Sequence, residues 1–229
     1  MAARRFGEMV RRRLRREPVA YILGRKGFRG IELAVDRRVL IPRPETEMLV
    51  ELALEIQPDS VLDVGTGSGA VALAIADELP SCRVVATDTS TAALEVAAAN
   101  AERLGLGERV RFVAGSVPAE GEFDLVVANL PYVASGEWPG LQPEVTQWEP
   151  REALLAGADG LDAIRTLLSE SVRSLSRSAP QGANGDVVAL EVGEGQASAV
   201  AELLHEAGFG AVETRPDLAG IPRLVWGHR

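Results

Sequence analysis

The stretch Val61-Leu62-Asp63-Val64-Gly65-Thr66-Gly67-Ser68-Gly69 joins a hydrophobic run to three glycines spaced two residues apart. The hydrophobic run predicts a buried strand. The glycines predict a tight turn into a helix, because glycine adopts backbone conformations that other residues avoid. In open α/β sheets, such a turn also lets a ligand approach the backbone closely. No Gly-Lys-Ser/Thr follows, so we do not expect a phosphate-binding loop.

Strands and helices alternate from this turn to the end of the sequence. Strands are expected at 60–64, 83–88, 109–113, 123–128, 186–192, 210–215 and 222–227, and helices at 69–79, 91–104, 159–178 and 196–207. This alternation favours a mainly parallel sheet covered on both faces. The last two strands are joined through Gly220-Ile221-Pro222, which is too short for a crossover. The predicted fold is α/β and doubly wound, a Rossmann-like, mainly parallel seven-stranded sheet with an antiparallel last hairpin.

The sequence before the glycine turn is organised differently. Residues 3–16 and 45–56 are expected to form helices, and residues 27–41 a short hairpin. Pro42-Arg43-Pro44 closes this hairpin, because the two prolines exclude a helix there. Far downstream, residues 177–185 are expected to be a surface loop. We divide the chain into an N-terminal helical segment (1–24), a β-hairpin linker (25–44) and the α/β domain (45–229).

Composition narrows the possible functions. The 229 residues fit one large domain, and the one cysteine, Cys82, excludes an internal disulfide and favours a reducing compartment. No apolar run is long enough to span a membrane. Residues 1–44 hold 13 Lys and Arg against 4 Asp and Glu, whereas the rest hold 11 against 29. The acidic body argues against stable nucleic-acid binding, while the Arg-rich start could contact RNA or an acidic partner, or be a solvated helix face.

Two acidic residues frame the glycine turn. Asp88 ends the second strand, 19 residues after Gly69, where a carboxylate can accept both ribose hydroxyls of an adenosine. Its alternative role is a helix cap, although Ser90 or Thr91 could serve as the cap instead. Asp63 lies inside the first strand and could hold the turn or face a cationic ligand. Both roles of Asp63 would be compatible with a sulfonium methyl donor.

The loop Asn129-Leu130-Pro131-Tyr132 follows the fourth strand, at the edge where ligands bind in open sheets. Asparagine offers a donor and an acceptor, proline stiffens the turn, and tyrosine supplies a flat apolar face. Such a loop can hold a planar group that carries N–H, either an amide or the amine of a base. A purely local role is the alternative, because Asn and Pro also close strands. Dehydrogenase and metal chemistry are not supported, since the two histidines lie late in the chain and no His/Cys cluster is present.

These motifs resemble a known family. The glycine turn with Asp88 resembles the S-adenosylmethionine site of class I methyltransferases, and residues 129–132 resemble the Asn-Pro-Pro-Tyr loop of amino-methyltransferases. Flanking blocks at 17–24, 40–47, 148–154, 157–161 and 217–220 are more specific. Together they resemble the release-factor glutamine methyltransferases, the HemK/PrmC family, over residues 17–229. Family members usually carry an N-terminal helical domain, of which we expect residues 1–24 to be a remnant.

The resemblance implies N5-methylation of the glutamine in the Gly-Gly-Gln loop of class I peptide-chain release factors, in the cytoplasm. S-adenosylmethionine would be the donor and S-adenosylhomocysteine the product, without a metal. It assigns the donor to Asp63, Gly65, Thr66, Gly67, Ser68, Gly69, Asp88, Ser116, Val117 and Asn129, with the ribose on Asp88 and the adenine near Ser116 and Val117. It assigns the glutamine amide to Asn129, Leu130, Pro131 and Tyr132.

Four further residues of the resembling blocks carry open interpretations. Arg43 and Glu45 could line the mouth of the crevice and contact the release factor. Alternatively, this segment could simply begin a helix, with Glu45 and Glu47 favoured by the helix dipole. Glu149 could form a surface pair with Arg151, or these residues could brace the substrate loop.

Two departures from the family pattern keep alternatives open. Leu130 replaces the first proline of the loop, where the family uses a backbone carbonyl, so the acceptor stays intact while the loop is slightly looser. An Asn-Leu-Pro-Tyr loop also occurs in ribosomal RNA adenine dimethylases, so an amino-methyltransferase acting on adenine or guanine is the first alternative. Ser116 stands where an aspartate is common, so adenine binding could be weaker. A non-catalytic module that binds the donor is the second alternative.

Overall fold

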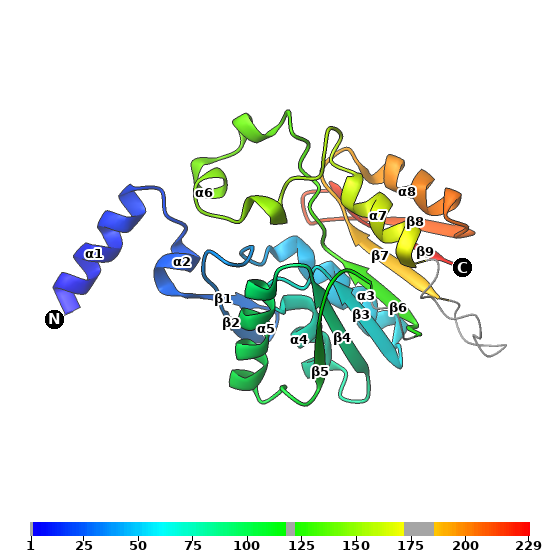
Figure 1. Cartoon of the computed structure of the whole chain (residues 1–229), viewed down its shortest axis with the longest axis horizontal. Helices are drawn as coiled ribbons and strands as arrows, with labels where there is room; N and C mark the ends of the chain where they lie inside the picture. Colours follow the sequence, from blue (N-terminus) through cyan, green and yellow to red (C-terminus); the bar gives the residue numbers. More distant parts are fainter. Residues whose placement is uncertain (1, 118–121, 172–185) are drawn as a thin grey trace.

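The computed structural model describes residues 2–117, 122–171 and 186–229, and its centre is a seven-stranded sheet of order β5-β4-β3-β6-β7-β9-β8 (Figure 1). The five strands from β3 to β7 pair in parallel, whereas β9 runs antiparallel to both β7 and β8. The predicted fold, with its antiparallel last hairpin, is therefore confirmed. The strands are β3 (Ser60–Val64), β4 (Arg83–Asp88), β5 (Val110–Ala114), β6 (Leu125–Ala128), β7 (Val187–Glu191), β8 (Ala211–Pro216) and β9 (Pro222–His228).

Helices cover both faces of the sheet because its strands are apolar on both sides. In β6, Leu125 and Val127 join one core cluster, and Val126 and Ala128 join the other. The first cluster is completed by α3 (Glu47–Ile56), α4 (Ala70–Glu78) and α5 (Thr91–Leu104). The second is completed by α7 (Asp162–Ser171) and α8 (Ala197–Glu206). The helix expected at 159–178 begins at Asp162, and residues 172–185, with the expected loop 177–185, lie outside the described residues.

The N-terminal part forms α1 (Ala2–Leu14), α2 (Val19–Leu23) and a hairpin of β1 (Arg25–Phe28) and β2 (Ile31–Ala34). The prediction of a hairpin reaching residue 41 is wrong for residues 35–41. A turn interrupts them, because the Val39 amide donates to the Asp36 carbonyl (3.1 Å) and the Arg38 amide donates to the Asp36 carboxylate (2.9 Å). The alternation in this stretch reflects burial in the core without strand pairing.

One buried side chain joins the hairpin to the glycine turn. Asn100 of α5 accepts a hydrogen bond from the Ala34 amide (2.7 Å) and donates to the carbonyls of Ala34 (3.0 Å) and Ser68 (2.9 Å). Asn100 is fully buried, so these bonds replace its hydration. The hairpin is thus anchored directly to the turn that the sequence placed at the ligand-binding edge.

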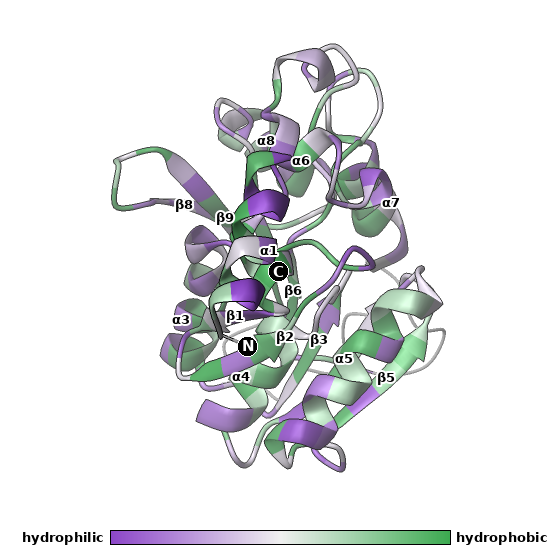
Figure 2. Ribbon diagram, turned by 90° about the vertical axis from the view of Figure 1, so that its left-hand side faces the viewer, coloured by the Kyte–Doolittle hydropathy of each residue, from purple (hydrophilic) through white to green (hydrophobic). Residues whose placement is uncertain are grey.

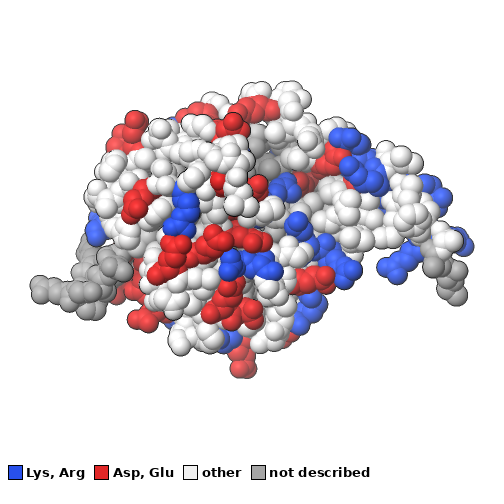
Figure 3. Space-filling view, turned by 180° about the vertical axis from the view of Figure 1, so that it is seen from behind, with Lys and Arg blue, Asp and Glu red and all other residues white. Residues whose placement is uncertain are grey.

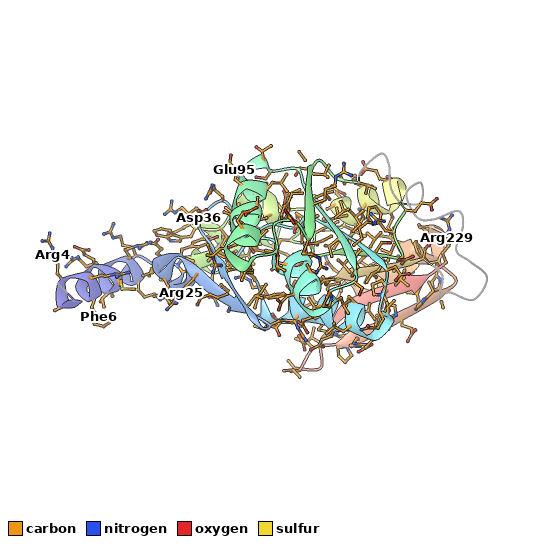
Figure 4. All side chains as sticks on the ribbon, turned by 90° about the horizontal axis from the view of Figure 1, so that it is seen from below. Arg4, Phe6, Arg25, Asp36, Glu95 and Arg229 are labelled. Atoms are coloured by element: carbon orange, nitrogen blue, oxygen red, sulfur yellow. The ribbon has the colours of Figure 1, made fainter. Side chains whose placement is uncertain are left out.

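Helix α1 extends away from the body, and Arg4 and Phe6 project from it into solvent (Figures 1 and 4). Its end is linked to the body by Arg13 and Arg16, which both pair with Glu144 of α6 (Pro143–Thr146), at 2.8 and 2.6 Å. Basic side chains gather at this end of the face in Figure 3, and acidic ones spread over the body. At the other end of the chain, the hairpin of β8 and β9 projects past the body (Figure 2). Among the described helices, none combines the length and apolarity needed to cross a membrane.

Candidate active site

The glycine turn connects β3 to α4, and its glycines adopt conformations that other residues avoid. Gly65, Gly67 and Gly69 have φ angles of 75°, 57° and 84°. A Cβ on Gly65 would lie 3.0 Å from the Leu130 side chain, and one on Gly69 would lie 2.9 Å from the Leu73 side chain. The turn therefore needs glycine at these two positions both for its backbone and for its close packing. Around Gly67 nothing lies within 4 Å of the corresponding position, so this backbone is open to a ligand.

Asp63 braces the turn from inside the core. Its carboxylate accepts a hydrogen bond from the Thr66 hydroxyl (2.6 Å) and another from the Ala72 amide (3.1 Å). Burial raises the pKa of Asp63 to about 6, and the two hydrogen bonds oppose that shift. Of the two roles considered for Asp63, these contacts match that of holding the turn.

Asp88 ends β4 beside the turn. Its carboxylate accepts from the Gly67 amide (2.9 Å) and from the Ser90 amide (2.8 Å). The cap of α5 is Ser90, whose hydroxyl accepts from the Ala93 amide (3.2 Å), so the helix does not depend on Asp88 for that function. Each carboxylate oxygen can accept more than one hydrogen bond, so Asp88 retains capacity for a ligand.

A cleft opens at the carboxyl ends of the central strands. Its empty volume is about 1020 Å³, a figure that includes space open to solvent. Three residues that the sequence analysis assigned to the donor do not line the cleft: Val117 packs against the core, and Asp63 and Gly69 are buried behind its surface. The cleft is lined by residues of the glycine turn, the end of β4, Gly115, Ser116 and the loop after β6, among them Gly65, Thr66, Gly67, Ser68, Asp88, Asn129, Leu130 and Pro131.

A second cavity meets the cleft at Asn129. It has an empty volume of about 550 Å³ and is mostly apolar. Asn129 lines both cavities, as do Leu40 and Ala153. The second cavity is otherwise lined by Arg43, Tyr132, Val133, Leu141, Val145 and Leu154. The structure therefore brings the donor-type cleft and the Asn-Leu-Pro-Tyr loop together, with one polar side chain at their junction.

Asn129 is held by a residue that the sequence analysis did not select. Its side-chain nitrogen donates to the hydroxyl of Thr46 (3.0 Å), which is itself buried. This bond uses the nitrogen of the carboxamide, so the oxygen remains available to a ligand. Thr46 ends the 3-10 helix η1 (Pro44–Thr46), 83 positions before Asn129. No local pattern connects the two residues, which is why Thr46 was missed.

Tyr132 is enclosed by residues that lie before α7, after β7 and at the start of α8. The side-chain nitrogen of Gln196 donates to the Tyr132 carbonyl (2.9 Å). A Cβ on Gly160 would lie 2.2 Å from that carbonyl oxygen, and one on Gly193 would lie 3.1 Å from the Tyr132 ring. Burial raises the pKa of Tyr132 to about 12, so the ring stays neutral at physiological pH. Gly160 belongs to the block 157–161 quoted above, whereas Gln196 and Gly193 were not identified.

Arg43 lines the second cavity and is paired with a buried acid. The Glu149 carboxylate accepts from the Arg43 guanidinium (2.5 Å) and from the Ile41 amide (3.1 Å). Glu149 therefore braces the segment before α3 and is not a surface partner of Arg151, whose guanidinium lies 5.3 Å from the Trp138 ring. Glu45 lines neither cavity and lies in the first turn of η1.

The strand order and the position of the cleft are those of class I methyltransferases, and solved structures agree. A methyltransferase from Pyrococcus furiosus superposes with a TM-score of 0.64 over 89% of this chain and 91% of that chain, at 20% identity. The hMettl16 catalytic domain, solved with a MAT2A 3′UTR hairpin, superposes with a TM-score of 0.67 over 85% of this chain and 75% of that chain, at 15% identity. At these identities the likeness concerns the fold. A family model described as a methyltransferase domain also matches residues 61–148.

Closer relatives define the family. A protein of Gloeobacter violaceus is 44% identical over 216 residues, which cover 91% of this chain and 73% of that protein. A protein of Neisseria gonorrhoeae is 44% identical over 230 residues, which cover 97% of this chain and 81% of that protein. Both are named release factor glutamine methyltransferase. The chain belongs to the release factor glutamine methyltransferase family, as its motifs predicted.

Membership of the class I methyltransferases implies use of S-adenosylmethionine, and the cleft fits such a ligand. The open backbone at Gly67 and the carboxylate of Asp88, both lining the cleft, suit a nucleoside with a polar tail. Within residues 2–117, 122–171 and 186–229, no group of three His, Cys, Asp or Glu side chains is arranged to hold a metal ion.

Proposed function

We propose that this protein transfers a methyl group from S-adenosylmethionine to the side-chain amide nitrogen of a glutamine in a release factor. The observation that carries the proposal is the position of Asn129, where the cleft meets the second cavity. A donor in the cleft and an acceptor in the second cavity would meet at that side chain. The names of the relatives supply the class of acceptor.

The donor would be held by the glycine turn and by Asp88. When bound, S-adenosylmethionine supplies an electrophilic methyl group on a sulfonium. The backbone of residues 65–68 would hold its amino-acid end, and the Asp88 carboxylate would accept the ribose hydroxyls. Ser116, which lines the cleft, would lie near the adenine, and Val117 would support that position from the core side.

The acceptor amide would be aimed by the loop after β6. A carboxamide nitrogen is a weak nucleophile because its lone pair is delocalised into the carbonyl. The Asn129 side-chain oxygen and the Leu130 carbonyl would accept its two N–H bonds, which orients the nitrogen and stabilises positive charge developing there. The Tyr132 ring would pack on the amide plane, and Pro131 would stiffen the loop. The nitrogen loses one proton to solvent after transfer, so no side-chain base is required.

The proposed substrate is the Gly-Gly-Gln glutamine of class I peptide-chain release factors, as expected from the family. The second cavity, lined by apolar side chains with Arg43 at its wall, would admit the glutamine while the flanking chain stays outside. With such a substrate, the enzyme would act in the cytoplasm, where translation occurs.

The division of the chain into an N-terminal helical segment (1–24), a β-hairpin linker (25–44) and the α/β domain (45–229) is also a proposal. Side chains of the hairpin share one core cluster with α3 and α4.

The proposal is tested by incubating the purified protein with isotopically labelled S-adenosylmethionine and either a release factor or RNA. Mass spectrometry then locates the label, which we expect on the glutamine side chain of the release factor. Label on a base amine would establish the nucleobase alternative instead. Donor binding without transfer to either would establish the non-catalytic module.

The Asn129→Ala variant tests the role of the loop in the same assay. We expect turnover to fall by about 100-fold or more, because an acceptor for the reacting amide is lost. The affinity for S-adenosylhomocysteine, measured by calorimetry, should stay within about threefold. Equal losses in turnover and affinity would count against this role.

A further inference from the structure

A buried carboxyl group near the loop has no role in the mechanism above. Glu191 is the last residue of β7, the strand next to β6, and only 4% of its surface is exposed. One of its carboxylate oxygens, Oε2, is buried without a hydrogen-bond partner among the described residues. Burying an unpaired acceptor is unfavourable, so its presence next to the active-site loop needs an explanation.

Thr46 connects Glu191 to Asn129. The Thr46 hydroxyl accepts a hydrogen bond from the Asn129 side-chain nitrogen (3.0 Å), and it lies beside the Glu191 carboxyl group, whose pKa it lowers. A hydroxyl has one hydrogen to donate, and an ionised carboxylate can only accept. Because Asn129 uses a lone pair of the Thr46 hydroxyl, the one hydrogen of that hydroxyl is left to point towards the Glu191 carboxylate, which would in this way set the direction of the hydrogen-bonded series.

We propose that Thr46 and Glu191 are positioning residues that set the orientation of the Asn129 carboxamide. With its nitrogen committed to Thr46, Asn129 presents its oxygen to the junction of the two cavities. The opposite orientation would present an NH₂ group to the NH₂ group of the substrate, and two donors cannot hydrogen-bond. This inference rests on the proposed function, because the required orientation follows from an acceptor that carries N–H.

The protonation state of Glu191 enters through the same geometry. Arg43, Glu45, Tyr132 and Arg223 face this carboxyl group, and burial raises its pKa to about 7. A protonated Glu191 can donate to Thr46, which frees the Thr46 hydroxyl to point at Asn129 and removes the preference for one carboxamide orientation. Turnover should therefore fall as the pH drops through about 7.

The test compares Thr46→Val, which removes the hydroxyl at nearly constant shape, with Thr46→Ser, which retains it. Turnover, KM for the release factor, affinity for S-adenosylhomocysteine and thermal midpoint are measured for each. Thr166→Val, which removes an exposed hydroxyl bonded within α7, is the matched control. We expect T46V to lower kcat by about 10- to 100-fold with KM and donor affinity within about threefold, and T46S to restore most of the loss. Equal kcat in T46V and T46S would overturn the proposal, as would equal losses of kcat and donor affinity in T46V.

Two further readouts keep the test decisive if T46V is unstable or if release factors are not substrates. In protein labelled with ¹⁵N-asparagine, the Asn129 NH₂ resonances, identified by their loss in N129A, should change in T46V and be retained in T46S. Unchanged resonances in T46V would refute the orienting bond without any activity measurement. In E191Q the fall of kcat below about pH 7 should disappear. Its persistence would show that Glu191 does not control the orientation of Thr46 and Asn129. A wild-type enzyme that methylates no release factor would refute the proposed function while leaving the resonance test valid.

Discussion

Replacing Asn100 with alanine should destabilise the fold at the point where the hairpin meets the glycine turn. The substitution removes the bonds that the Asn100 oxygen accepts from the Ala34 amide (2.7 Å) and the partly exposed Arg103 guanidinium (3.1 Å). It also removes the two that the nitrogen donates to the carbonyls of Ala34 and Ser68, at 3.0 and 2.9 Å. A net hydrogen bond contributes about 1 kcal/mol, and buried groups left unpaired add to the loss, so we expect about 3–4 kcal/mol. For a chain of this length the thermal midpoint should fall by roughly 6–15 °C.

Urea denaturation followed by circular dichroism measures this loss. Glu95→Ala, at an exposed position of the same helix, is the matched control and should change stability by less than about 0.5 kcal/mol. Asn100→Asp places a carboxylate oxygen against the carbonyls of Ala34 and Ser68 in a fully buried site, so its loss should be at least as large as that of N100A. A loss below about 1 kcal/mol in N100A would show that water or a shifted backbone replaces these bonds, and would refute the reasoning.

Two further variants test the donor site and the wall of the second cavity. Asp88→Ala should weaken S-adenosylhomocysteine binding by about 10- to 100-fold in calorimetry, because a carboxylate accepting ribose hydroxyls is lost; an unchanged affinity would exclude the ribose role. Arg43→Met leaves the Glu149 carboxylate, 2% exposed, with the Ile41 amide alone, and should cost about 1–3 kcal/mol of unfolding free energy, since Arg43 is partly exposed. The double variant Arg43→Met/Glu149→Gln should recover part of that loss, and no recovery would mean that the pair is not the cause.

The parts of the fold that could be predicted are those recorded in local patterns. The strand before Gly65 and the helix after Gly69 follow from a hydrophobic run and from glycines that need positive φ angles. The antiparallel pairing of β8 and β9 follows from the short connection between them. The assignment of residues 35–41 to the hairpin is wrong because their alternation of apolar and polar residues reflects burial and not strand pairing. A chain that turns at Asp36 buries the same apolar side chains as a strand would.

The parts of the site that were missed depend on contacts between distant segments. Asn129 and Asp88 were found because each follows directly from a predicted strand. Thr46 and Gln196 contact the loop from positions 83 and 64 residues away from their partners. Thr46 lies in the block 40–47, but nothing in that block indicates a contact with Asn129, and Gln196 lies outside the blocks. Their roles depend on which elements pack together at the carboxyl edge of the sheet, and that packing is determined by the whole chain.

The most direct measurement is a crystal structure of the protein with S-adenosylhomocysteine and a peptide containing Gly-Gly-Gln. The account predicts the glutamine side chain in the second cavity, with its NH₂ group within hydrogen-bonding distance of the Asn129 side-chain oxygen and directed towards the sulfur of the bound product. A complex in which the Asn129 oxygen points away from the ligand, or in which the peptide binds without entering that cavity, would contradict it.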